Sequence, residues 1–309
     1  MSATEPALVK GVRVTRVNRC IELLESGQPI YMDGVPELSY DAGREQSGTW
    51  ADYLTVEFEH FPLNTVGLAA FMRGLRDAGP TRSGHPTPTV ICTLPAHGAS
   101  AAEIHANAWQ IRHILTAGVH GLLLCHARDP AAVRAFVEAC RFPFQTIGVG
   151  SGLGEGTRGA GGQSAAAEIW RLDPEAYLRV ADPWPLNPHG ELLLGLKIED
   201  RHALQRARET TAVPGVGFAE WGPGDMAMSF GHASRHDPPY PPEMDAARTA
   251  VRAACAAAGL PFLCSWADPA MTMEEQVRHL IDEVGALIIG GGEAHAAFGR
   301  GYTQRAMPV

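Results

Sequence analysis

The chain has 309 residues, of which 45% are hydrophobic and 19% are charged, a normal composition for a globular protein with a core of its own. The formal net charge of -9 argues against a surface that binds nucleic acid or an anionic membrane. No run of about 18 apolar residues predicts a membrane span. The six cysteines form no CxxC pair, so neither a zinc ribbon nor a disulfide framework is indicated. Because the N-terminus also has no apolar leader of signal-peptide type, we expect a reduced, cytoplasmic enzyme.

Short apolar runs alternate along the chain with longer stretches of helical character. In chain order, the predicted elements are strand Tyr53–Phe58, strand Thr89–Thr93, helix Ser100–Ala117, strand Gly121–Cys125, helix Pro130–Cys140, strand Phe144–Val149, helix Pro174–Val180, strand Leu192–Glu199, helix Arg201–Thr211, strand Gly215–Trp221, helix Pro242–Ala258, strand Phe262–Ser265, helix Thr272–Glu283 and strand Ala286–Ile289. Several strands are leucine-rich without alternation, as expected for strands buried on both faces. About eight such units in roughly 280 residues predict a single domain over residues 1–309, a closed (β/α)8 TIM barrel.

Two segments have the composition of irregular structure. Gly34–Gly48 is polar and rich in turn residues. Gly150–Gly162 is glycine-rich, but it matches neither a P-loop nor a dinucleotide-binding fingerprint. A mobile lid or a subunit-contact loop is therefore a better interpretation of the second segment than a phosphate cradle.

Two carboxylates follow neighbouring predicted strands, where the catalytic groups of a (β/α)8 barrel lie. Glu199 ends one apolar run, and Asp225 follows the next run after several glycines. Such a pair provides the hard oxygen donors that Mg²⁺ or Mn²⁺ prefers, and the glycines would let backbone N–H groups approach a bound anion, which makes Gly224 a candidate substrate contact. Two structural interpretations stay open: Glu199 could cap a helix, and Asp225 could be the N-cap of a helix that starts at Met226.

Histidines follow three other predicted strands. His60 comes directly after Glu57-Phe58-Glu59, and a buried acid and imidazole at this point would each need a partner. His60 could act as a general base or orient a metal-bound water, with an acid beside it. The other polar residues at strand ends are Thr93, His97 and His126. Each histidine, taken alone, is also compatible with a structural role.

Together, these segments resemble the HpcH/HpaI aldolase family, which includes 4-hydroxy-2-oxoheptanedioate aldolase and 2-dehydro-3-deoxyglucarate aldolase. Asn18–Gly27 is similar to the family's opening segment, and Gln110–Arg128 is similar to its helix-plus-strand signature. Glu57–His60 falls on the Asp-x-Glu-His motif, and Lys197–Glu199 falls on Gln-x-Glu. Gly222–Gly231 (GPGDMAMSFG) is close to Gly-Pro-x-Asp-Leu-Ser-x-Ser-x-Gly. The resemblance covers nearly the whole chain.

The resemblance implies a barrel of the phosphoenolpyruvate/pyruvate type and a lyase that makes or breaks a carbon–carbon bond next to a pyruvate enolate. It also implies that Glu199 and Asp225 hold a divalent metal ion, Mg²⁺ or Mn²⁺. Family members form hexamers from trimers, or from dimers that exchange C-terminal helices. We therefore expect a homo-oligomer, a trimer or hexamer, in which residues 290–309 pack on a neighbouring subunit through Phe298 and Tyr302.

Three positions depart from the family pattern. The arginine that grips the pyruvate carboxylate is replaced by Thr93, whose hydroxyl cannot form a bidentate charged clamp. The glutamine before the metal glutamate is Lys197, and the aspartate of the Asp-x-Glu-His motif is Glu57. Lys197 and Glu199 are two apart on a strand and so face the same side, which puts an ammonium near the metal. Lys197 could anchor the substrate, act as a base, or form a salt bridge to an acid such as Glu57.

We therefore expect a metal-dependent aldolase or related lyase that acts on a small 2-oxo acid or similar enolisable substrate. His60, paired with Glu57, would move the proton, and Lys197 would assist catalysis. The expected substrate-binding residues are Thr93, Gly224, Lys197 and His126. A decarboxylase or a bond-forming synthase on the same fold, and a non-catalytic paralogue, are the alternatives.

Overall fold

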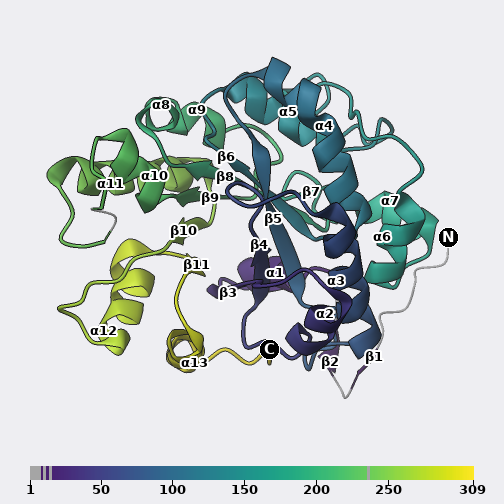
Figure 1. Ribbon diagram of the computed structural model, residues 1–309, viewed down its shortest axis with the longest axis horizontal. Helices are drawn as coiled ribbons and strands as arrows, with labels where there is room; N and C mark the ends of the chain where they lie inside the picture. Colours follow the sequence, from purple (N-terminus) through teal and green to yellow (C-terminus); the bar gives the residue numbers. More distant parts are fainter. Residues whose placement is uncertain (1–7, 10–11, 14–15, 235–236) are drawn as a thin grey trace.

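In the computed structural model, which describes residues 8–9, 12–13 and 16–309 apart from 235–236, parallel strands close into a barrel surrounded by helices (Figure 1). The eight barrel strands are β3 (Ile30–Gly34), β4 (Tyr53–Val56), β5 (Thr89–His97), β6 (Gly121–Cys125), β8 (Leu192–Ile198), β9 (Phe218–Trp221), β10 (Phe262–Cys264) and β11 (Ile288–Ile289). The pairing of β6 with β8 closes the ring. The predicted (β/α)8 barrel is therefore confirmed.

Helices connect the strands and cover the outside of the barrel. They are α1 (Arg19–Glu25), α2 (Tyr40–Gln46), α3 (Thr65–Ala78), α4 (Ala101–Thr116), α5 (Pro130–Cys140), α6 (Gln163–Trp170), α7 (Pro174–Val180), α8 (Arg201–Gln205), α9 (Ala207–Thr211), α10 (Pro223–Ser229), α11 (Pro242–Ala258), α12 (Met273–Arg278), the π-helical turn η1 (His279–Val284) and α13 (Glu293–Tyr302). Two short pairs lie outside the ring: β7 (Pro183–Trp184) on β8, and β1 (Leu8–Val9) with β2 (Val12–Arg13). Among the described residues, no helix is long and apolar enough to cross a membrane.

One end of the barrel interior is closed by apolar side chains. Inward residues of the strands, such as Ile30, Leu193 and Phe218, form one cluster with Cys20, Ile21, Leu23 and Leu24 of α1. Because α1 precedes the first barrel strand, this plug lies at the N-terminal ends of the strands. The opposite, C-terminal end of the barrel is where sites of this fold lie.

Local sequence explains most of the boundaries. Every residue of β6 and of β8 is buried, which accounts for their continuous apolar sequence. Helix α4 begins after Ser100, whose side chain accepts the N–H of Glu103. Gly118 (φ +90°) and Gly259 (φ +68°) follow α4 and α11 in the left-handed region, which ends each helix with a conformation that favours glycine.

Three predictions about the elements are wrong. Phe144–Val149 forms turns with one isolated bridge, from Val149 to Leu153, and Phe144 and Ile147 are exposed. The missing barrel strand is β3, which the sequence analysis did not identify. The segment Gly34–Gly48, expected to be irregular, contains helix α2.

The glycine-rich loop 150–162 lies between α5 and α6 and is anchored to neighbouring helices. The N–H of Gly154 bonds to Glu138 Oε1 at 2.6 Å, and the buried Arg158 bonds to the Tyr177 hydroxyl at 2.6 Å. These partners belong to α5 and α7, and the loop follows the C-terminal end of α5. It therefore lies away from the strand ends that carry the site, which does not support a lid. A subunit contact stays a prediction.

Candidate active site

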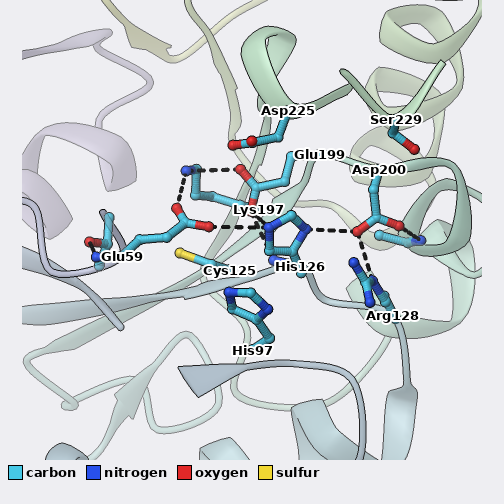
Figure 2. Close-up of polar contacts among 12 residues, drawn as sticks. Glu59, His97, Cys125, His126, Arg128, Lys197, Glu199, Asp200, Asp225 and Ser229 are labelled. Atoms are coloured by element: carbon cyan, nitrogen blue, oxygen red, sulfur yellow. Dashed lines mark hydrogen bonds and ion pairs between the residues drawn. The ribbon is translucent and has the colours of Figure 1, made fainter. Parts of the chain in front are cut away.

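Polar side chains from five strands meet at the C-terminal end of the barrel (Figure 2). They are Glu57, Glu59 and His60 after β4; Thr93 and His97 on β5; Cys125 and His126 at the end of β6; Lys197, Glu199 and Asp200 at the end of β8; and Asp225 in α10, after β9. Parallel strands bring their carboxyl ends to one side, so residues up to about 170 positions apart become neighbours. The structure brings together all the strand-end residues that the sequence singled out.

The turn after β4 is held by Thr93. Its Oγ1 accepts the N–H of Phe58 at 2.7 Å and donates to Glu57 Oε1 at 2.7 Å. The same Glu57 oxygen accepts the N–H groups of Glu59 at 2.6 Å and of His60 at 3.3 Å. Glu57 therefore caps the backbone of this turn. We had expected it to pair with the His60 imidazole, and it does not. The Thr93 hydroxyl, expected to meet the substrate, is already engaged in this turn.

Glu59 is the buried acid at the centre of the site, with 1% of its side chain exposed. Lys197 Nζ lies 2.6 Å from Glu59 Oε2 and 2.8 Å from Glu199 Oε2, so the expected salt bridge of Lys197 exists, but with Glu59 and Glu199 and not with Glu57. Burial opposes ionisation of Glu59, yet His126 and Lys197 outweigh it and hold its pKa well below the usual range. Burial also opposes the charge on Lys197, but the surrounding carboxylates, Glu220 first, raise its pKa. Lys197 therefore stays protonated, which does not support the interpretation of Lys197 as a general base.

His126 is held between two carboxylates. Its Nδ1 lies 2.8 Å from Asp200 Oδ2, and its Nε2 lies 3.3 Å from Glu59 Oε1. Burial works against the imidazolium, but hydrogen bonds to Asp200 and Glu59 outweigh it and raise the pKa of His126 to about 10. Arg128 Nε also donates to Asp200 Oδ2, at 2.8 Å. Figure 2 shows His126 and Arg128 side by side on Asp200. The rim of the site therefore carries an imidazolium and a guanidinium.

Asp225 and His60 form the more open side of the site. His60 is 55% exposed, contrary to our expectation of a buried imidazole, and its Nε2 lies 3.7 Å from Asp225 Oδ2 and 3.6 Å from Glu59 Oε2. Asp225 lies in the first turn of α10, which begins at Pro223, so it is not the N-cap. Gly224 in the same turn has open space where a Cβ would be.

Glu199 is completely buried, and its carboxylate has room only because Gly222 has no side chain. A Cβ on Gly222 would come within 2.8 Å of Glu199 Oε2, so a side chain at that position would displace the carboxylate. Glu199 Oε1 accepts the N–H of His126 at 2.8 Å. Asp200, and not Glu199, is the N-cap of α8, which removes the capping interpretation of Glu199.

The carboxylates around Glu59 fit a small divalent cation. Ligand atoms of Glu59, His60 and Asp225 all lie within 4.8 Å of one another, and so do those of Glu59, Cys125 and Glu199. Glu199 Oε2 and Glu59 Oε1 are buried, and their close partners in the described part of the chain are cationic groups, Lys197 Nζ at 2.8 Å and His126 Nε2 at 3.3 Å, at angles too oblique for a strong hydrogen bond. Buried oxygens in this condition suit Mg²⁺ or Mn²⁺. Glu199 and Asp225 stay our predicted ligands, with Glu59 as a third carboxylate at the same place.

Three residues that shape the site were missed or undervalued in the sequence. Asp200 directly follows the predicted metal acid, and its position as a helix N-cap hid its contact with His126. Arg128 was not singled out. Glu220 lies inside an apolar run that predicts a strand. An acid in such a run could have been identified as part of the site, because an acid in the barrel interior needs a partner.

Comparison with known proteins gives consistent matches. The sequence profile of the family described as HpcH/HpaI aldolase/citrate lyase matches residues 102–292. The hydroxypyruvate/pyruvate aldolase of Deinococcus radiodurans is 28% identical over 186 residues, which cover 60% of this chain but only 54% of that enzyme. The 4-hydroxy-2-oxo-heptane-1,7-dioate aldolase of Klebsiella pneumoniae is 24% identical over 281 residues, covering 84% of this chain and 88% of that one. A HpcH/HpaI aldolase/citrate lyase family protein of Burkholderia cenocepacia has the same fold, with a TM-score of 0.67 at 21% identity, covering 93% of this chain and 97% of its own.

Proposed function

Because this chain belongs to the HpcH/HpaI aldolase/citrate lyase family, we propose that it is a divalent-metal-dependent aldolase-like lyase that acts on a 2-oxo acid or a related enolisable substrate. The observation that carries the proposal is the position of Glu59 at the C-terminal end of the barrel, where it shares one group of possible metal ligands with His60 and Asp225 and another with Cys125 and Glu199. Relatives named as aldolases support the reaction class. A bound Mg²⁺ or Mn²⁺ would supply a Lewis acid that polarises the substrate carbonyl.

His60 is our candidate for proton transfer. Its Nε2 lies within 4 Å of carboxylate oxygens of both Glu59 and Asp225, which would stabilise the imidazolium once it has taken a proton. Its exposure leaves the ring accessible to a substrate or to a water. Glu57 supports this role indirectly, because it fixes the backbone of the turn that carries His60.

The substrate carboxylate needs a cation, and Thr93 does not provide one. His126 and Arg128 are cationic groups at the rim, and Lys197 is a third that faces the carboxylates below. None of them presents the free planar fork of an unpaired arginine. We therefore propose that pyruvate itself is a poor substrate and that the native substrate offers a different group to this rim, with Gly224 leaving room for it.

The proposal is tested by exchange of deuterium from solvent into the methyl or methylene group next to the carbonyl, across a panel of 2-oxo acids. The enzyme is first stripped with a chelator and then given Mg²⁺ or Mn²⁺. We expect exchange and carbon–carbon cleavage with at least one 2-oxo acid, dependent on the added ion and lost in Glu199→Ala. Glu175→Gln is the matched control, since this acid is exposed and remote from the site.

Two results would count against the proposal. Full activity of Glu199→Ala after exhaustive chelation would remove the metal from the mechanism. Absence of both exchange and cleavage over the whole panel, in protein that binds Mn²⁺, would favour a non-catalytic paralogue.

A further inference from the structure

The ammonium of Lys197 lies on the oxygen that a metal ion would need. Glu199 Oε1 is engaged by the N–H of His126, so Oε2 is the oxygen of this carboxylate left for a cation. Lys197 Nζ lies 2.8 Å from that oxygen and 2.6 Å from Glu59 Oε2. Both contacts are drawn as dashed lines in Figure 2. A divalent ion bound through Glu199 Oε2 would therefore share this oxygen with the Lys197 ammonium. Two cations held on one carboxylate oxygen repel each other strongly in a desolvated site.

Directly beneath these carboxylates, the barrel contains a cavity of about 120 Å³. Lys197 and Glu220 both line it, together with Glu57 and Thr93. Lys197 on β8 and Glu220 on β9 are register partners in the parallel sheet, so their Cα atoms are neighbours and both side chains point into the barrel. The cavity thus offers space on the side of Lys197 that faces away from Glu199.

The Glu220 carboxyl is available as an alternative partner. Within the described residues it makes no hydrogen bond in the present arrangement, although it faces the cavity. Burial raises the pKa of Glu220 to about 7, and the nearby Lys197 opposes that shift. Glu220 is half-buried and lines the cavity, so an approaching ammonium would be favourable for its carboxylate.

We propose that the Lys197 ammonium neutralises the carboxylates of the metal-free site and is displaced when the metal ion binds. Without metal, its ammonium bridges Glu59 and Glu199. When a divalent ion engages Glu199, the ammonium turns into the cavity and pairs with Glu220, which makes Glu220 a positioning residue for the metal site. The inference deepens the proposed function and rests on its metal dependence, but it concerns binding and not turnover.

The test is Mn²⁺ affinity, measured without substrate by calorimetry and by the electron paramagnetic resonance signal of free Mn²⁺. The proteins are the unaltered enzyme, Lys197→Gln, Glu220→Gln, the double variant, and Glu175→Gln as a remote charge control. We expect Lys197→Gln to bind Mn²⁺ about tenfold more tightly and Glu220→Gln about tenfold more weakly. In the double variant, the loss of Glu220 should have little effect, because no ammonium remains to be accommodated.

Three outcomes would overturn the inference. Equal weakening by Glu220→Gln with and without Lys197 would mean that Glu220 acts by its charge alone. Weaker binding in Lys197→Gln would mean that the lysine supports the metal ligands. Absence of Mn²⁺ binding in all variants would contradict both the inference and the proposed metal dependence. A protein that shows the expected affinities but no activity would contradict only the proposed lyase activity. Glu220→Leu, which also fills the cavity, provides a second variant if Glu220→Gln fails to fold.

Discussion

Thr93 Oγ1 donates a 2.7 Å hydrogen bond to Glu57 Oε1 and accepts the N–H of Phe58 at the same distance, so one hydroxyl joins the middle of β5 to the turn after β4. This turn carries Glu59 and His60. Thr93 therefore acts on the site through the backbone of that turn.

Thr93→Val should destabilise the protein by about 1–3 kcal/mol, because it leaves the buried N–H of Phe58 without its acceptor and removes one of the three donors to Glu57 Oε1. Thr93→Ser retains the hydroxyl and should lose less than half of that amount. Urea unfolding monitored by tryptophan fluorescence measures both. Equal losses in the two variants would show that the methyl group, and not the hydroxyl, is what matters.

Thr93→Arg should raise the exchange of solvent deuterium into the methyl group of pyruvate by about tenfold or more. An arginine at this position could contact the substrate carboxylate, and a missing charged contact of this kind weakens binding by roughly 1.5–3 kcal/mol. Exchange is followed by proton nuclear magnetic resonance in the presence of Mg²⁺. Rapid exchange of pyruvate by the unaltered enzyme would show that the threonine does not restrict substrate choice.

Asp200→Asn should lower the pKa of His126 by more than one unit in metal-free protein. Asp200 accepts from His126 Nδ1 at 2.8 Å and is the first contributor that raises this pKa to about 10. The amide keeps an oxygen for the cap of α8, so the helix should stay intact. Imidazole nitrogen chemical shifts over a pH titration measure the change, and an unaltered His126 titration would contradict the assignment.

Glu191→Gln should gain stability relative to the unaltered protein as the pH rises. Burial raises the pKa of Glu191 to about 7, although the N–H of Asn18, at 2.8 Å from Oε2, and Arg16 lower it. A carboxyl whose folded pKa lies above its unfolded value of about 4.3 favours folding at low pH, and this contribution is lost between that value and about pH 7. The difference between variant and parent should therefore shift by about 1–3 kcal/mol between pH 5 and pH 8. Parallel stability curves would show that Glu191 titrates normally.

The chain should sediment as a trimer or hexamer at micromolar concentration. The inner face of α13 packs on its own barrel, where Ala296 is buried and Arg300 donates to the carbonyl of Trp50. Tyr302 stays 37% exposed on the outer face, where Arg278 lies over its ring. We expect this outer face to meet a neighbouring subunit, so Tyr302→Glu should shift the equilibrium toward smaller species. A monomer in the unaltered protein would contradict the expectation.

The amino-acid sequence alone predicted the barrel, which the structure confirms, and the end of the barrel at which the candidate site lies. Apolar runs such as those of β6 and β8 reveal buried parallel strands, and a polar residue directly after such a run must emerge at the C-terminal end. This is why Glu199, His126 and His60 could be singled out. The relation is local, since it depends on residues adjacent in the chain.

Only the tertiary structure decided which strand completes the barrel and which charges meet. Phe144–Val149 (FQTIGV) and Ile30–Gly34 (IYMDG) are both short segments that mix apolar and polar residues, but only Ile30–Gly34 pairs with a barrel strand on either side. Lys197 pairs with Glu59 and not with Glu57 because register and side-chain direction, set by strands more than 100 residues apart, fix the distances. Electrostatic interactions depend on those distances within a few ångströms, and the order of residues along a chain does not specify them.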